Sequence, residues 1–381
     1  MTQYRPMKLL VDGLVFSEPG SAYASIWKGV LRELSRRHSL MVLDRGNTPK
    51  IAGATLVPFP AYLGTHTAAD SALIQEVCAL HQAEVFLSTG YTSPLRTPSI
   101  ALVTDVFPEL LDPDGDDRWR MEKRLAIHFA RSLLCISDRV REDLADLYPW
   151  PKNEQVGVAK AGVDRNIFRP RALSEVEAFR VEHGIAGPYF VWMERPRALP
   201  SQRKIDTFLE AVRDSGFAKA QLVVLESGEI CTLQKTPVQG SVLQADADDD
   251  ARAICLSGAS ALILPTPGEG FGFRVDEAID CCCPVVASHH PALEARVEQV
   301  SWVPGTWTST SLADALGCIA GLPRLAYTQG QPTDVGTGFP ALAAELERRL
   351  MALRNEHLSG QHDSFLARWS ELRTIQAEVD F

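Results

Sequence analysis

Short apolar runs alternate with segments of helical spacing along the first part of the chain. Ser25–Arg37 and Arg118–Ala130 carry apolar side chains at helical spacing, which predicts a helix in each. The apolar runs between and around them predict strands at Met7–Val11, Leu40–Leu43, Val85–Ser88, Ile100–Val103 and Leu133–Ile136. Short apolar strands that alternate with helices are typical of parallel sheets covered on both faces.

The same alternation repeats after Pro170. Strands are predicted at Tyr189–Trp192, Leu222–Leu225, Ala261–Leu264 and Pro284–Ala287. Helices are predicted at Lys204–Arg213, Asp248–Ser257, Phe273–Ile279 and Leu312–Ala320. We therefore expect an α/β protein of two Rossmann-like, doubly wound domains, residues 1–170 and 171–360, with residues 361–381 forming a helix that packs back on the first domain. Open α/β sheets bind ligands at the carboxyl ends of their strands, so both edges are expected to face a cleft.

Composition and charge narrow the range of partners. The chain has 381 residues, 45% of them hydrophobic and 23% charged, which excludes wholesale disorder and leaves room for two cores. The formal net charge of −10 disfavours a nucleic-acid partner. Although the whole chain is acidic, the segment Arg118–Arg141 contains seven basic side chains and only two acidic ones. It predicts either an ordinary helical region with solvated charges or a basic rim that contacts an anionic acceptor or the inner membrane surface.

Other features favour a cytoplasmic protein without a metal. No apolar stretch approaches the ~18 residues of a membrane span, and the amino terminus lacks the pattern of a signal peptide. The eight cysteines have mostly apolar neighbours and form no C-x-x-C pair, which predicts reduced core residues. The histidines show no ligand spacing, and Asp246–Asp250 is interpreted as a solvated run that caps the next helix.

The most informative segment is Pro265–Ile279. It follows an apolar strand, contains glycines at alternate positions and opens a helix, so its backbone amides suit a phosphate or a sugar hydroxyl. If the helix began near Glu269, then Glu277 would lie on the same side about two turns away.

This segment resembles the Glu-x7-Glu motif of glycosyltransferase family 4, whose members are retaining enzymes of the GT-B type. Ala278–Ser288 continues the resemblance with a small-residue stretch and a Pro-Val-Val strand. The resemblance implies that Glu269 faces the donor sugar as a catalytic residue and that Glu277 binds the nucleotide ribose. The intervening turn supplies further donor-binding residues, Gly270, Phe271, Gly272 and Phe273.

A second resemblance concerns the diphosphate. Tyr189–Arg195 is similar to the family's strand that ends in a phosphate-binding arginine, here Arg195, and Ala161–Pro170 is similar to its interdomain connector. The family's lysine at the head of the next helix corresponds to either Arg203 or Lys204. Basic side chains at these places can neutralise a diphosphate leaving group.

On the acceptor side, Ser17–Tyr23 resembles the family's glycine loop, which makes Gly20 and Ser21 the candidate cleft residues. Many members have His-Asp where this chain has Thr104-Asp105, so Asp105 is a second catalytic candidate without a neighbouring imidazole. Glu194 also departs from the family, which has a glycine before the arginine.

These expectations combine into a retaining hexosyltransferase that needs no cofactor. It would move a sugar, of the mannose type, from a GDP- or UDP-linked donor to a hydroxyl of a glycan or lipid-linked acceptor in cell-surface polysaccharide or glycoconjugate synthesis. A non-catalytic domain that binds nucleotide sugars, an epimerase and a phosphorylase of the same architecture remain alternatives. A dehydrogenase is least favoured, because no Gly-x-Gly-x-x-Gly follows the first strand.

Overall fold

The computed structural model divides the chain into two compact units. Unit 1 comprises Met1–Pro19, Ile26–Ala161 and Gly336–Phe381, and unit 2 comprises Gly20–Ser25 and Gly162–Val335. The residues that the structure describes are 5–17, 22–63, 67–104, 106, 109, 118–129, 132–148, 156–159, 162–193, 202–215, 217, 219–226, 242–246, 248–265, 272–288, 300–303, 307–320 and 339–358. The division after Ala161 lies a few residues before the boundary expected at Pro170.

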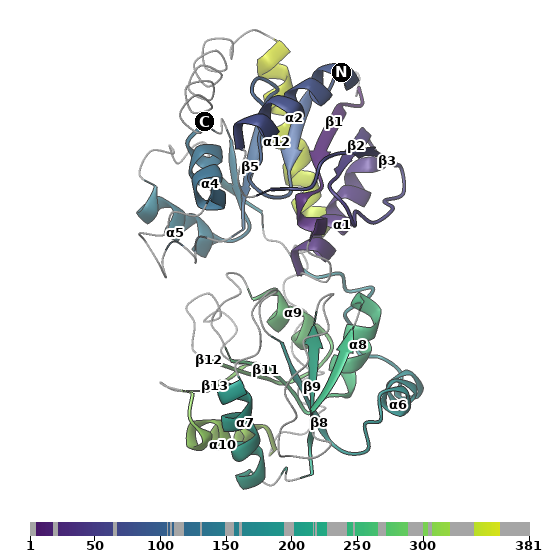
Figure 1. The fold of residues 1–381 in the computed structure, drawn as a ribbon, viewed down its shortest axis with the longest axis vertical. Coiled ribbons are helices and arrows are strands. Elements are labelled where there is room, and N and C mark those ends of the chain that lie inside the picture. The colour runs from purple at the N-terminus through teal and green to yellow at the C-terminus, as the bar shows by residue number, and fades with distance from the viewer. Residues whose placement is uncertain are drawn as a thin grey trace. The chain divides into compact units, whose positions relative to one another are not determined.

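The described strands of unit 1 form one parallel sheet with the order β3-β2-β1-β4-β5-β6-β7 (Figure 1). Their bounds are β1 (Lys8–Asp12), β2 (Ser39–Asp44), β3 (Ala54–Pro58), β4 (Val85–Ser88), β5 (Ser99–Val103), β6 (Leu133–Cys135) and β7 (Val156–Val158). β1 is fully buried at Leu9, Leu10 and Val11, as expected of a central strand with both faces covered.

Helices cover this sheet. They are η1 (Leu14–Ser17), α1 (Ala22–Ser35), α2 (Thr67–His81), α4 (Arg118–Phe129), α5 (Asp138–Leu147) and α12 (Phe339–Leu358). α2 packs Ile74 and Cys78 onto Leu10, Leu43 and Phe86 of the sheet. This apolar contact anchors the helix directly over β1, β2 and β4.

The helix α12 returns to unit 1 from the far end of the sequence. It contacts β4 and β5, and Arg349 donates to Ser132 Oγ at 2.7 Å and to Leu133 O at 3.3 Å. Gly29 of α1 lies so close to the ring of Phe339 that a Cβ atom would overlap it. Residues 339–358, which we expected in the second domain, are therefore part of unit 1. The helix expected at 361–381 lies outside the described residues.

The described strands of unit 2 form a second parallel sheet with the order β10-β9-β8-β11-β12-β13. The strands are β8 (Tyr189–Trp192), β9 (Gln221–Glu226), β10 (Val242–Asp246), β11 (Ala261–Leu264), β12 (Val285–Ser288) and β13 (Val300–Val303). One face packs against α6 (Leu173–Glu182), α8 (Asp249–Gly258) and α9 (Phe273–Asp280). The other packs against α7 (Gln202–Asp214) and α10 (Ser309–Ala320), which also contact each other.

Both sheets have the same internal order. In each, the first strand of the unit lies between the second and the fourth, so the direction of winding reverses beside it. These reversals, β1 beside β4 and β8 beside β11, are the topological switch points at which α/β sheets bind ligands. The expected fold class, doubly wound α/β with parallel sheets, is confirmed.

The cysteine prediction holds for most of the described thiols. Cys78, Cys135, Cys255, Cys281 and Cys283 are free and buried. Cys282 is half-buried, and Cys318 is exposed on α10, so the prediction of a core role is wrong for Cys318. Among the described residues, no cluster of side chains is arranged to hold a metal ion. No helix in this part of the chain is long and apolar enough to cross a membrane.

Candidate functional site

Two neighbouring strands bring the predicted donor-site segments to one edge of the sheet in unit 2. β8 and β11 pair in parallel with Trp192 opposite Ile263, so their carboxyl ends lie side by side. The segment containing Arg195 follows β8 in the chain, and the segment containing Glu269 follows β11. Both therefore depart from the switch point. Several predicted residues lie outside the described part of the structure: Gly20, Ser21, Asp105, Arg195, Glu269, Gly270 and Phe271.

The helix α9 begins at this edge with a left-handed residue. Gly272 is its N-cap, with φ 81° and ψ 31°, a conformation that side chains with a Cβ rarely adopt. α9 consequently starts at Phe273, which is buried, rather than near Glu269. This start confirms the helix predicted at Phe273–Ile279, so the condition under which Glu277 would lie two turns from Glu269 on one helix is not met.

The predicted ribose-binding residue Glu277 lies in a buried ionic cluster. Its side chain is 1% exposed. Oε2 accepts hydrogen bonds from Arg252 Nε at 3.0 Å and from Arg274 Nη1 at 3.0 Å. Oε1 accepts a hydrogen bond from Arg252 Nη2 at 3.1 Å. Arg252 thus holds both oxygens of the carboxylate through its planar fork, the geometry that suits guanidinium groups best.

The two arginines were not among the residues predicted from the sequence. Arg274 precedes Glu277 by one helical turn on α9, a spacing that is visible in the sequence. Arg252 comes from the first turn of α8, and only the packing of α8 beside α9 brings it to Glu277. The prediction that the acidic run Asp246–Asp250 caps the next helix is confirmed for Asp248. Asp248 caps α8 by accepting a hydrogen bond from Ala251 N at 2.8 Å.

The first turn of α7 contains the other two predicted donor-site cations. Arg203 is exposed and Lys204 is half-buried, and this turn contains no acidic residue. A helix amino terminus carries partial positive charge, which adds to the charge of these two cations. Because α7 follows β8, this positive charge would favour an anionic ligand at the switch point.

The switch point of unit 1 contains a different ionic cluster. Asp12, at the carboxyl end of β1, accepts from Arg45 Nε at 2.8 Å and from Arg45 Nη2 at 2.7 Å. Arg45 also pairs with Asp70 of α2, at 3.0 Å through Nη1 and 2.7 Å through Nη2. The side chains of Arg45 and Asp12 are both 0% exposed. This cluster fastens β1, the segment after β2, and α2 to one another.

Aromatic rings and charge together stabilise the cation in this cluster. The Arg45 guanidinium lies 4.7 Å from the ring centre of Phe59 and 5.7 Å from that of Tyr62. Burial lowers the pKa of Arg45, but hydrogen bonds to Asp12 and Asp70 outweigh burial and raise it. The sequence showed Asp12 only as an interruption of an apolar run, which is the signal by which the cluster could have been noticed.

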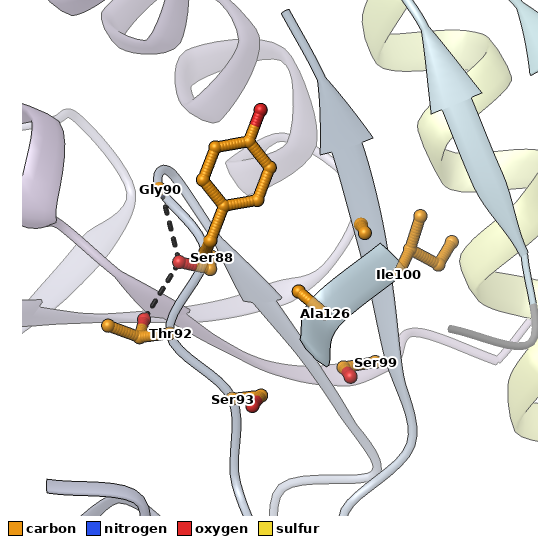
Figure 2. A pocket seen from close by; sticks show the side chains of 9 residues that line it. Ser88, Gly90, Thr92, Ser93, Ser99, Ile100 and Ala126 are labelled. Atoms are coloured by element: carbon orange, nitrogen blue, oxygen red, sulfur yellow. Dashed lines mark hydrogen bonds between the residues drawn. The ribbon is translucent and has the colours of Figure 1, made fainter. Parts of the chain in front are cut away.

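A small cavity lies beside this cluster. It has a volume of about 10 Å³ and is lined mainly by hydroxyl-bearing residues at the end of β4, in the segment after it and at the start of β5 (Figure 2). Thr92 Oγ1 donates to Asp12 Oδ2 at 2.6 Å, so the hydroxyl of Ser88, 2.8 Å away, donates to Thr92. Gly90 N donates in turn to Ser88 Oγ at 3.0 Å. Figure 2 shows the two hydrogen bonds that join Gly90, Ser88 and Thr92, and the bond from Thr92 to Asp12 continues this chain from the cavity wall to the cluster. The space is large enough for one water.

The basic stretch of residues 118–141 is less available to solvent than its sequence indicates. Lys123 is 1% exposed at its side chain and pairs with Glu109 at 2.7 Å. Arg120 is also buried. Tyr148 donates to the same Glu109 Oε1 at 3.3 Å, and burial followed by the charge of Glu109 raises the pKa of Tyr148 to about 12. The expectation of solvated charges along this helix is wrong for Arg120 and Lys123, because both face the protein interior.

The remaining described cations of this stretch are mostly compensated at the surface. On α5, Arg139 pairs with Asp143 at 2.8 Å and Arg141 pairs with Asp138 at 3.0 Å. Arg124 is exposed on α4. The described part of the stretch therefore presents a weaker basic surface than the charge count predicts.

Comparisons with known proteins give structural neighbours only. No protein-family model matches the chain, and no curated protein matches it. The Anabaena protein HepE, solved in complex with UDP and glucose, matches with a TM-score of 0.67 and 15% identity over 91% of this chain and 99% of HepE. WaaG, a glycosyltransferase involved in lipopolysaccharide biosynthesis, matches with a TM-score of 0.67 and 15% identity over 89% of this chain and 99% of WaaG.

A further neighbour performs different chemistry. UDP-GlcNAc 2-epimerase from Methanocaldococcus jannaschii matches with a TM-score of 0.57 and 11% identity over 89% of this chain and 99% of the epimerase. At these identities the likeness establishes the fold. The chain has the GT-B-type fold, with two Rossmann-like units.

Proposed function

We propose that this protein is a retaining glycosyltransferase that takes a hexose from a nucleoside diphosphate donor. One observation carries the proposal. The switch point of unit 2 combines a cationic helix start without an acidic residue in its first turn, at Arg203 and Lys204, with the buried carboxylate of Glu277 on α9, which covers the opposite face of the sheet and begins at the same edge. Cations at a helix amino terminus suit a diphosphate, and a carboxylate suits the hydroxyls of a ribose.

The comparisons support a ligand of this class. HepE has the same fold and was solved with UDP and with UDP-glucose, and WaaG is a glycosyltransferase. The partner that we propose for this chain is accordingly a nucleotide sugar, with UDP or GDP as the carrier. The mannose-type sugar and the glycan or lipid-linked acceptor, which were expected from the family resemblance, remain part of the proposal.

The proposed mechanism assigns a role to each donor-site residue. Arg195, with Arg203 or Lys204, offsets the charge that develops on the diphosphate as its bond to the sugar breaks. Glu269 orients the donor sugar through its hydroxyls, and Glu277 binds the ribose. Asp105 contacts the sugar or the acceptor. We propose departure and attack on the same face of the sugar, with the diphosphate assisting deprotonation of the acceptor and with no cofactor.

The proposed setting is cytoplasmic, with peripheral contact at the inner membrane through residues 118–141. The burial of Lys123 and Arg120 limits this contact to the remaining basic side chains of the stretch. Binding to anionic vesicles that increases as salt is lowered would support the contact. Equal recovery with neutral and anionic vesicles would remove the membrane from the proposal.

The decisive experiment begins with a thermal-shift screen of UDP- and GDP-linked sugars. The donor that stabilises the protein is then incubated with glycan and lipid-linked acceptors, and transfer of labelled sugar is measured. Glu269→Ala should abolish most of the turnover while the unfolding temperature changes little. Glu177→Ala is the matched control, because the exposed side chain of Glu177 pairs with Arg180 on α6. Full transferase activity in Glu269→Ala would overturn the assignment.

The epimerase neighbour makes a second activity worth testing in the same samples. An epimerase converts the nucleotide sugar without any acceptor, whereas a transferase releases the nucleoside diphosphate only when an acceptor receives the sugar. Conversion of the sugar without acceptor would replace the proposed activity. Binding without turnover on any acceptor would instead favour a non-catalytic domain.

A further inference from the structure

Two guanidinium groups surround the buried carboxylate of Glu277, although one would be enough to neutralise its charge. Arg274, one turn earlier on the same helix, already pairs with Oε2 at 3.0 Å. Arg252 adds two further hydrogen bonds from a different helix and reaches both carboxylate oxygens. Burying a second guanidinium carries a large desolvation penalty, so its presence calls for a specific contribution.

Arg252 is itself held from two sides. Its Nη2 donates to Asp249 Oδ1 at 2.6 Å, and its guanidinium lies 5.1 Å from the ring centre of Phe168. The side chain is 3% exposed. These contacts fix the plane of the guanidinium fork, and the fork in turn fixes the plane of the Glu277 carboxylate.

The bonding pattern also distinguishes the two oxygens of Glu277. Oε2 accepts from both arginines, whereas Oε1 accepts from Arg252 alone within the described part of the chain. A carboxylate oxygen accepts about two hydrogen bonds, so Oε1 retains the capacity for one more. Rotation of the carboxylate, which Arg274 alone would permit, would exchange the two oxygens.

We propose that Arg252 is a positioning residue that orients the Glu277 carboxylate so that Oε1 receives a ribose hydroxyl of the donor nucleotide. This inference rests on the proposed function. It extends that function by assigning recognition of the ribose to two residues. Glu277 contacts the ribose, and Arg252 acts on the ribose only through Glu277. The consequence is a coupling: the contribution of the ribose hydroxyls to affinity depends on Arg252.

The test compares two nucleotides across a set of variants. Calorimetry measures the Kd of UDP and of GDP, and the tighter of the two is paired with its 2′,3′-dideoxy form. A hydrogen bond to a charged group corresponds to roughly a tenfold or greater preference, so the wild type should bind the ribonucleotide about tenfold more tightly than the dideoxy form. Arg252→Met should reduce this preference to about twofold or less, mainly by weakening the ribonucleotide.

Two further variants separate positioning from general structural damage. Arg252→Lys retains a charge but lacks the fork, so it should fold as the wild type does and still lose most of the preference. Arg171→Met is the matched control. Arg171 also pairs with α8, through Asp250, yet its described contacts do not include Glu277. This variant should keep the full preference for the ribonucleotide.

Each outcome decides the matter. If Arg252→Met does not fold, Arg252→Lys alone provides the comparison. A wild-type preference that persists in the folded Arg252 variants overturns the positioning role and leaves the proposed function intact. Equal affinity of the wild type for both nucleotides overturns the positioning role together with the proposed contact of Glu277 with the ribose, and leaves the proposed sugar transfer intact. Failure of the wild type to bind either UDP or GDP overturns the proposed function together with the inference.

Discussion

The two units have the same strand order, yet their switch points arrange buried charges in opposite ways. In unit 1 a cation is central, since Arg45 lies between the carboxylates of Asp12 and Asp70. In unit 2 an anion is central, since Glu277 lies between the guanidinium groups of Arg252 and Arg274. Both clusters stand where open α/β sheets bind their ligands.

The difference lies in what each cluster leaves for a ligand. Asp12 is 0% exposed, and it already accepts hydrogen bonds from Arg45 and Thr92. Arg45 uses its fork on two carboxylates that belong to different elements of unit 1. The cluster of unit 1 therefore fastens chain segments together. The cluster of unit 2 orients one carboxylate on a helix that begins at the switch point. The same architecture can thus use buried ion pairs either as fasteners or as a support for a binding group.

The largest expected effect comes from removing the central cation of unit 1. Arg45→Met leaves the buried carboxylate of Asp12 and the half-buried carboxylate of Asp70 without their shared partner, and breaking a buried pair costs about 3–5 kcal/mol of the free energy of unfolding. Arg252→Met should cost less, because Glu277 retains Arg274. Urea unfolding followed by circular dichroism measures both. An equal loss of unfolding free energy in the two variants would contradict the view that the Arg45 cluster holds chain segments together whereas Arg252 mainly orients Glu277.

The next effect tests whether α12 is part of unit 1. Gly29→Ala places a methyl group against the ring of Phe339, and overpacking of this kind costs about 1–3 kcal/mol. Gly317→Ala on α10 is the matched control, because a Cβ atom there meets open space. Thermal unfolding of the two variants should show a loss only for Gly29→Ala. Unchanged stability of Gly29→Ala would mean that the contact between α1 and α12 adapts freely.

A smaller effect depends on pH and again concerns unit 1. Burial lowers the pKa of His38 from 6.5, against the opposing charge of Glu347, while Arg354 and Arg37 lower it further. Met7 N donates to His38 Nδ1 at 3.2 Å, so protonation of that nitrogen breaks the hydrogen bond. Because the unfolded state binds the proton more readily, this contribution to stability is complete above about pH 6.5 and is lost as the pH falls below it.

The variant His38→Asn isolates this contribution, because its amide oxygen can still accept from Met7 N but does not titrate. Unfolding free energies at about pH 7.5 and about pH 5.5 should differ less in His38→Asn than in the wild type. The same pH dependence in both proteins would assign the titration to another group.

The smallest effect is expected at the surface of α5. Arg139 and Arg141 pair with acidic residues one turn away, and their side chains are 50% and 48% exposed. Exposed pairs of this kind contribute little, so the double change to alanine should alter the free energy of unfolding by less than about 1 kcal/mol. Urea unfolding is again the measurement. A loss similar to that of Arg45→Met would show that burial is not what separates these ion pairs from the two clusters.

The strands that the sequence predicted and those that it missed differ by position in the sheet. The interior strands, such as β1, β4, β8 and β11, are apolar on both faces and were predicted within one or two residues. The four missed strands, β3, β7, β10 and β13, are the edges of the two sheets. β3 was missed because it contains no fully buried residue, so its sequence resembles that of a half-exposed loop. An apolar run marks a strand only where both faces are covered.

The site was predictable to the extent that its residues are close in sequence. The strand, the glycine at the start of α9 and the carboxylate of Glu277 all lie within one short segment, and the hydrophobic pattern placed them at a strand end. The pair of Arg252 with Glu277 joins two helices, and the pair of Arg45 with Asp12 joins β1 to the segment after β2. The two residues of each pair are far apart in the sequence and share no periodic pattern, so only the tertiary structure reveals that they are paired. α12 had a readable helical pattern, with Leu342, Leu346 and Leu350 on one face, but the pattern does not say which sheet it covers.

The return of α12 to the first sheet also affects the order in which the protein can fold during synthesis. The described strands of unit 2 all lie between residues 189 and 303, so its sheet can assemble once that stretch has left the ribosome. The sheet of unit 1 is translated earlier but must await Phe339–Leu358 before the surface that Phe339 and Arg349 cover is closed. The unit that is translated first is thus the one that is completed last, and its apolar surface at α1, β4 and β5 stays unprotected while unit 2 is being made.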